Sequence, residues 1–143
     1  MLYSSGTTGQ PKGILRPMPD EPPEFTLPLH GFLYDLWQYR EGMIYLSPAP
    51  LYHAAPNVAV GLTLRKGGTA IIMEHFDPAQ YLSLVEKHQI THSQLVPTMF
   101  SRMLKLPAET RATANLASLE IAIHAAAPCP PQVKEQMIDW WGP

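Results

Sequence analysis

The sequence has a single cysteine and no long apolar run. Its single cysteine, Cys129, cannot form a disulfide within the chain, which is typical of proteins from a reducing compartment. No apolar run reaches the length of about 18 residues that a membrane helix needs, and no charged segment followed by an apolar one opens the chain. We therefore expect a soluble, cytoplasmic protein with no transmembrane segment.

Charge of either sign is also scarce. Charged residues make up 15% of the sequence, and the formal net charge is −2. Because nucleic acids and anionic lipids are usually bound by a clustered basic face, we expect no nucleic-acid partner. The histidines do not indicate a metal site either: His88 and His92 are four residues apart, but the HExxH pattern is missing.

Apolar residues, by contrast, make up 45% of the 143 residues, enough for one domain with a packed core. They gather in short runs with helical patterns between them, which predicts strands joined by helical crossovers. The runs do not alternate strictly, as is typical of strands covered on both faces. We therefore predict an α/β fold with an open, mainly parallel sheet and helices on both sides. The expected strands are 43–46, 69–73, 90–96 and 119–123.

Two of the expected helices carry signals for their first residues. Asp77 can cap a helix in which Pro78 takes the first position and Gln80 the capping-box position. Thr98 is a candidate cap for the helix that follows the third strand. In parallel sheets, ligands bind beyond the carboxyl ends of the strands. Segments 47–56 and 124–130 are expected at that edge.

The most informative segment is 3–13, Tyr-Ser-Ser-Gly-Thr-Thr-Gly-Gln-Pro-Lys-Gly. Glycines allow backbone N–H groups to turn toward a ligand, hydroxyls can bind phosphate oxygens or magnesium, and Lys12 supplies a positive charge. The segment is not a Walker loop, because Gln10 and Pro11 separate Gly9 from Lys12. A solvated turn is the alternative for a generic loop of this composition, but the full string is far more specific.

The string resembles the signature phosphate loop of the adenylate-forming superfamily, which includes acyl-CoA synthetases, peptide-synthetase adenylation domains and luciferases. The resemblance continues at 50–55 (PLYHAA), 76–78, 91–99, 116–119 and 125–128 (AAAP). The family usually has glycine where Ala55 or Pro56 and Ala125 or Ala126 stand here.

The resemblance covers effectively the whole chain. It implies a single partial AMP-binding domain at 1–143, part of the large N-terminal domain of such an enzyme. The family's later motifs and its C-terminal domain are expected beyond Pro143, and we predict that this fragment alone cannot complete adenylation.

The reaction that the resemblance implies has two steps. A carboxylate attacks the α-phosphate of Mg-ATP, which gives an acyl-adenylate and pyrophosphate, and a thiol then takes the acyl group. The expected substrates are a small-molecule carboxylate (a fatty acid), ATP and coenzyme A, with Mg²⁺ as cofactor. The resemblance assigns catalysis to Thr8, Lys12 and His53.

Binding roles are carried over in the same way. The residues assigned to the phosphates are Ser4, Ser5, Gly6, Thr7, Thr8, Gly9 and Lys12, with Thr7 or Thr8 near magnesium. Ala126, Ala127 and Pro128 would border the adenine, and His53, Asn57 and Gly61 would face the acyl pocket. Two alternatives to an acyl-CoA ligase stay open. One is a peptide-synthetase-type adenylation domain, and the other is a non-catalytic nucleotide-binding module, hinted at by the alanines at 125 and 126.

Overall fold

The computed structural model describes residues 2–3, 10, 13–15, 17, 19–22 and 24–143. Its centre is a sheet of four strands, β3 (Ile44–Ser47), β4 (Thr69–Ile72), β5 (His92–Leu95) and β6 (Ile121–His124). The strands lie in the order β4-β3-β5-β6, and every neighbouring pair is parallel. The structure thus confirms the parallel sheet predicted from the apolar runs.

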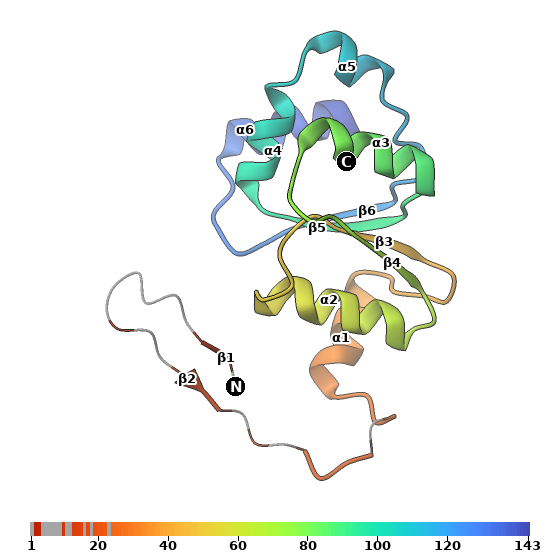
Figure 1. Ribbon diagram of the computed structural model, residues 1–143, viewed down its shortest axis with the longest axis vertical. Helices are drawn as coiled ribbons and strands as arrows, with labels where there is room; N and C mark the ends of the chain where they lie inside the picture. The colour runs from red at the N-terminus through yellow and green to blue at the C-terminus, as the bar shows by residue number, and fades with distance from the viewer. Residues whose placement is uncertain (1, 4–9, 11–12, 16, 18, 23) are drawn as a thin grey trace.

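Helices cover both faces of this sheet (Figure 1). One face carries α1 (Pro28–Leu36) and α2 (Ala54–Arg65), and the other carries α3 (Pro78–His88), α4 (Pro97–Leu104) and α6 (Pro131–Trp141). Parallel crossovers are almost always right-handed. Because the step from β3 to β4 runs opposite to the step from β4 to β5, α2 and α3 fall on opposite faces.

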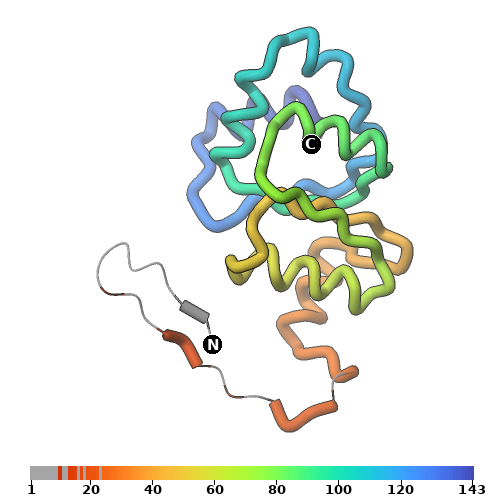
Figure 2. The backbone as a smooth tube through the Cα atoms, in the orientation of Figure 1, coloured from red at the N-terminus to blue at the C-terminus, as the bar shows by residue number. Residues whose placement is uncertain are grey.

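The two helical layers come from different parts of the chain. In Figure 2 the layer of α1 and α2 is drawn in orange to yellow-green, whereas the layer of α3, α4 and α6 is drawn in green to blue. A short helix, α5 (Ala108–Thr113), precedes β6 and had no signal that the sequence analysis detected. Among the described residues, no helix is both long and apolar enough to cross a membrane.

Each helical layer has its own apolar core. The larger core lies between the sheet and α3, α4 and α6. It includes Tyr81, Val85 and Met103, which are fully buried. The smaller core lies under α1 and α2 and includes Tyr34, Tyr45 and Leu62. Burial of apolar side chains on both faces of the sheet explains why the strand sequences do not alternate.

The first residues of α3 and α4 can be compared with the two caps predicted from the sequence. The Asp77 carboxylate accepts a hydrogen bond from the Gln80 backbone N–H at 2.8 Å, with Pro78 at the first position, so that cap is confirmed. The prediction for Thr98 is wrong. Helix α4 begins at Pro97 after an extended Val96, because proline suits the first helical position and favours an extended residue before it.

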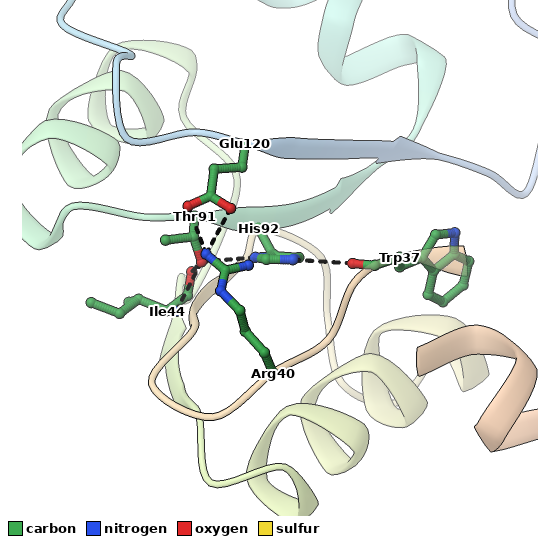
Figure 3. Close-up of polar contacts among 6 residues, drawn as sticks. All are labelled: Trp37, Arg40, Ile44, Thr91, His92 and Glu120. Atoms are coloured by element: carbon green, nitrogen blue, oxygen red, sulfur yellow. Dashed lines mark hydrogen bonds and ion pairs between the residues drawn. The ribbon is translucent and has the colours of Figure 1, made fainter. Parts of the chain in front are cut away.

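A polar network joins the amino ends of three strands (Figure 3). The Thr91 hydroxyl oxygen accepts a hydrogen bond from the backbone N–H of Ile44 at 3.0 Å, which links the start of β5 to β3. The Arg40 guanidinium donates to both carboxylate oxygens of Glu120 at 2.6 Å, which ties the segment before β3 to the residue before β6. This network lies at the edge opposite to the carboxyl ends of the strands.

The first residues form a second, two-stranded sheet. Strand β1 (Leu2–Tyr3) pairs antiparallel with β2 (Gly13–Ile14), and Figure 1 shows this pair apart from the main sheet. The two strands bracket the predicted phosphate loop. All of its assigned phosphate-binding residues lie outside the described residues: Ser4, Ser5, Gly6, Thr7, Thr8, Gly9 and Lys12.

Candidate active site

The strand order creates a crevice between the carboxyl ends of β3 and β5. The chain leaves β3 toward α2 on one face and leaves β5 toward α4 on the other. The two connections therefore diverge, and such a reversal of strand order is where open parallel sheets bind ligands. Both segments expected at this edge, 47–56 and 124–130, follow strands of the same sheet, β3 and β6.

A pocket of about 310 Å³ occupies this crevice. We call it the crevice pocket. The residues that line it follow β3, begin α2, lie at the end of β5 or just after it, or follow β6. They are Ala49, His53, Ala54, Ala55, Pro56, Gln94, Leu95, Val96, Ala125 and Ala126. The pocket thus combines residues from three of the segments that resemble the family, 50–55, 91–99 and 125–128, which are far apart in sequence.

The start of α2 gives one wall of the pocket an electrostatic character. His53 is the N-cap residue, in an extended conformation, and its side chain makes no capping hydrogen bond. The backbone N–H groups of Ala54 and Ala55 belong to the first turn, so they have no acceptor within the helix. Both residues line the pocket. The positive end of the helix dipole therefore favours an anionic group, such as a carboxylate, at this wall.

His53 is held beside the pocket by its neighbours in the turn. Its backbone N–H donates to the carbonyl of Pro50 at 3.2 Å, and its ring lies 4.4 Å, centroid to centroid, from the ring of Tyr52. The exposed imidazole is therefore available to a ligand. The role that the family resemblance assigns to His53 stays a prediction.

The loop after β6 reaches the pocket through an unusual backbone conformation. Ala126 has a φ of 70°, in the left-handed region where glycine is favoured because a Cβ atom causes strain. This is one of the positions at which the family's glycine was expected. Strain of this kind tends to persist at functional sites, where surrounding structure enforces it.

Gln94 is a pocket residue that the sequence analysis missed. It lies on β5 and lines the crevice pocket, and within the described part of the chain its buried Oε1 atom has no hydrogen-bond partner. Its position in an expected strand gave no signal, because the sequence does not show which strand residue faces a ligand. Only the strand order places it beside His53 and Ala126.

Other predicted site residues are not brought into the pocket. Asn57 and Gly61 lie exposed on α2, and Ala127 and Pro128 lie exposed in the loop after β6; none of the four lines the crevice pocket. Their assigned roles stay predictions, as do those of the loop 4–12. The described residues contain no group of three or more histidine, cysteine or acidic side chains able to hold a metal ion.

Comparison with known proteins identifies the family. The chain is 31% identical over 143 residues to the medium/long-chain-fatty-acid–CoA ligase FadD8 of Mycobacterium tuberculosis, covering 100% of this chain and 24% of the ligase. It is 33% identical over 149 residues to feruloyl-CoA synthase of Amycolatopsis, covering 97% of this chain and 27% of the synthase. The chain thus spans about a quarter of the length of these curated relatives.

A solved structure supports the same relationship. The ATP-bound crystal structure of MatB from Rhodopseudomonas palustris superposes with a TM-score of 0.80 at 27% identity, covering 99% of this chain and 27% of MatB. The likeness confirms the predicted fold class, a parallel sheet with helices from the N-terminal domain of an adenylate-forming enzyme. The family model described as AMP-binding enzyme matches residues 1–143, and the chain therefore belongs to the AMP-binding enzymes.

Proposed function

We propose that the protein containing this chain is an acyl-CoA ligase, which uses ATP to activate a carboxylic acid as an acyl-adenylate and transfers the acyl group to coenzyme A. The observation that carries the proposal is the crevice pocket, where His53 of one motif and Ala126 of another meet beyond the carboxyl ends of the strands. Membership of the AMP-binding enzymes and the CoA-ligase relatives support the same activity.

The pocket suits the first step of this reaction. A carboxylate that enters at the start of α2 meets the positive end of the helix and the side chain of His53. The nucleotide would lie toward Ala126, with Ala127 and Pro128 of the same loop bordering its adenine. This arrangement would bring the attacking oxygen and the α-phosphate together, and positioning of this kind is a large part of catalysis in phosphoryl chemistry.

The departing pyrophosphate needs compensation of its negative charge. We assign that role to Lys12 and to the backbone and hydroxyl groups of the loop 4–9. We further propose that Mg²⁺ binds near Thr7 or Thr8, where it would neutralise phosphate charge. These residues lie outside the described residues, so the assignment depends on the sequence motif.

The acid that we propose has a largely apolar body, such as a fatty acid. Alanine, leucine, valine and proline make up most of the described lining of the crevice pocket, and none of the described lining residues is an aspartate or a glutamate that would attract an amino group. Among the curated relatives, FadD8 is named a medium/long-chain-fatty-acid–CoA ligase, which supports this class of acid.

The test is carboxylate-dependent exchange of pyrophosphate into ATP by the complete protein, with a panel of short, long and aromatic acids. We expect exchange with at least one acid, and a decrease of about 10²- to 10³-fold in Lys12→Ala because a charge contact to the transition state is lost. His53→Ala should also lower the rate, whereas His75→Ala, an exposed residue after β4, should not. Exchange that persists unchanged in Lys12→Ala would refute the loop assignment, and ATP binding without exchange would indicate a non-catalytic module.

A further inference from the structure

The carboxamide of Gln94 is the polar group that the sheet itself contributes to the crevice pocket. Apart from His53, the other described lining residues carry only apolar side chains. The Oε1 atom of Gln94 is buried and lacks a hydrogen-bond partner among the described residues. A buried acceptor without a partner is destabilising and uncommon in folded proteins, so its place in a ligand pocket is informative.

The backbone fixes the direction of this side chain. His92 and Gln94 both lie on β5, and side chains two residues apart on a strand point to the same face of the sheet. The side chain of His92 lies on the face that α1 covers, where its ring contacts Tyr39 and its Nε2 atom lies 3.1 Å from the carbonyl oxygen of Trp37. Gln94 therefore points to the face carrying α1 and α2.

This direction turns Gln94 toward the side of the pocket that α2 forms. The carboxyl group of the acid is proposed to lie at His53, where α2 begins, and the adenine is proposed to lie toward Ala126 and the loop after β6. Because α2 covers the face to which Gln94 points, its carboxamide would lie against the acid. That conclusion rests on the proposed function.

We propose that Gln94 is a specificity-determining residue whose carboxamide hydrogen-bonds a hydroxyl group on the body of the acid. The substrate class is then a hydroxylated carboxylic acid with an otherwise apolar body. A hydroxyl group fits because it both donates and accepts, so it pairs with the amide oxygen or the amide nitrogen, whichever faces it. A site built to bind a hydroxyl group discriminates strongly against the analogue without one, because its own polar group is then left unpaired.

The experiment compares acids that differ by one hydroxyl group, using the complete protein and pyrophosphate exchange. Two matched pairs are 4-hydroxycinnamate with cinnamate and 10-hydroxydecanoate with decanoate. For at least one pair, we expect kcat/KM to be about tenfold or more higher for the hydroxylated acid. Gln94→Met, which keeps the length of the side chain but removes both polar atoms, should bring that ratio to within about twofold.

Two further variants separate recognition from structure. Gln94→Asn retains the carboxamide at a shorter reach and should give an intermediate ratio. Gln132→Met changes an exposed glutamine on α6 and should leave the ratio as in the wild type. A purely structural role for Gln94 would lower kcat/KM by the same factor for both members of a pair, and this result would overturn the assignment.

The remaining outcomes are also decisive. A wild-type protein with exchange activity but no preference within either pair would overturn the assignment and leave the proposed function intact. A change in the KM for ATP alone in Gln94→Met would place the carboxamide at the nucleotide and would also overturn it. Absence of exchange with every acid would overturn the proposed function, and the assignment with it.

Discussion

The Nε2 atom of His92 lies 3.1 Å from the carbonyl oxygen of Trp37, and this contact places a hydrogen on Nε2 of a fully buried imidazole. A carbonyl can only accept, so Nε2 carries a hydrogen. The Nδ1 atom lies 2.7 Å from the hydroxyl oxygen of Thr91, whose single hydrogen can point to Nδ1 or to the carbonyl oxygen of Ile44 at 3.1 Å. With the Thr91 hydrogen turned to Nδ1, a neutral ring satisfies both contacts and links the C-terminal end of α1 to β5 (Figure 3).

Acid should destabilise the protein through His92. Burial is the largest cause that lowers the pKa of His92 below its ordinary value of 6.5, and the positive charge of Arg40 adds to it. As the pH falls through about 6.5, the unfolded chain takes up a proton that the folded protein resists. The free energy of unfolding should therefore show no contribution from His92 above that pH and decrease below it.

Urea denaturation between pH 7.5 and pH 5 measures this dependence. His92→Gln retains a donor for the carbonyl of Trp37 and removes the titrating group, so its pH dependence should be flatter. His75→Gln, an exposed histidine after β4, serves as the matched control and should keep the wild-type slope. Equal slopes in His92→Gln and wild type would contradict the prediction.

Loss of the Asp77 cap should weaken α3. Asp77→Ala removes the hydrogen bond at 2.8 Å from the Gln80 backbone N–H to the carboxylate, and we expect a loss of about 1 kcal/mol in the free energy of unfolding. Asp77→Asn retains an acceptor and should lose much less. Chemical denaturation of both variants tests this, and equal losses would show that charge rather than capping is responsible.

Glycine at position 126 should stabilise the protein. Ala126 has a φ of 70°, where a Cβ atom costs about 1–2 kcal/mol, and the larger entropy of glycine in the unfolded chain offsets about 0.5–1 kcal/mol of the relief. Ala126→Gly should thus raise the free energy of unfolding by up to about 1.5 kcal/mol.

The neighbouring alanine provides the control for position 126. The residues with positive φ in the described part of the chain do not include Ala125, so Ala125→Gly should only lose stability, by about 0.5–1 kcal/mol. Denaturation curves of the two variants should therefore shift in opposite directions. A loss of stability in both would argue against strain at Ala126.

Replacement by alanine should have opposite effects on stability at two glycines, Gly68 after α2 and Gly61 within it. A Cβ atom on Gly68 would lie 2.7 Å from Cγ of Met43 and 2.9 Å from its carbonyl oxygen. That oxygen cannot readily move, because it accepts a hydrogen bond from the Thr69 backbone N–H at 2.9 Å. Gly68→Ala should therefore destabilise the protein by about 1–3 kcal/mol.

At Gly61, by contrast, an added methyl group has space. A Cβ atom there meets nothing within 4 Å, and Gly61 lies exposed inside α2. Gly61→Ala should stabilise the protein by about 0.5–1 kcal/mol through helix propensity. Thermal unfolding measured side by side tests both changes, and a stabilised Gly68→Ala would refute the packing argument.

Local chemistry explains which elements the sequence could predict. Strands such as β3 and β4 are apolar runs bounded by turn residues, and the cap at Asp77 depends on groups three residues apart. Thr98 shows the limit of such reasoning. Threonine is a common N-cap residue and proline a common first helical residue, so the sequence allowed two starts, and the helix begins at Pro97. The pair β1 and β2 and helix α5 are too short to give a periodic signal.

The residues of the candidate site likewise fall into those that local sequence indicates and those that it does not. The phosphate loop, His53 and the alanines near 126 could be proposed from the sequence because motifs are contiguous, and residue chemistry within a motif is visible in the sequence. Gln94 could not be found, because nothing local distinguishes it from other strand residues. Its partner-free oxygen and its place in the pocket depend on neighbours that come from elsewhere in the chain.

The amino-acid sequence alone therefore determined the fold class, the family resemblance and the chemical nature of the loops at the carboxyl edge. Only the tertiary structure decided the strand order β4-β3-β5-β6, the crevice that this order opens, and the residues that meet there. The physical reason is that strand pairing and side-chain burial are interactions between segments distant in the chain, whereas turns, caps and motifs depend on adjacent residues.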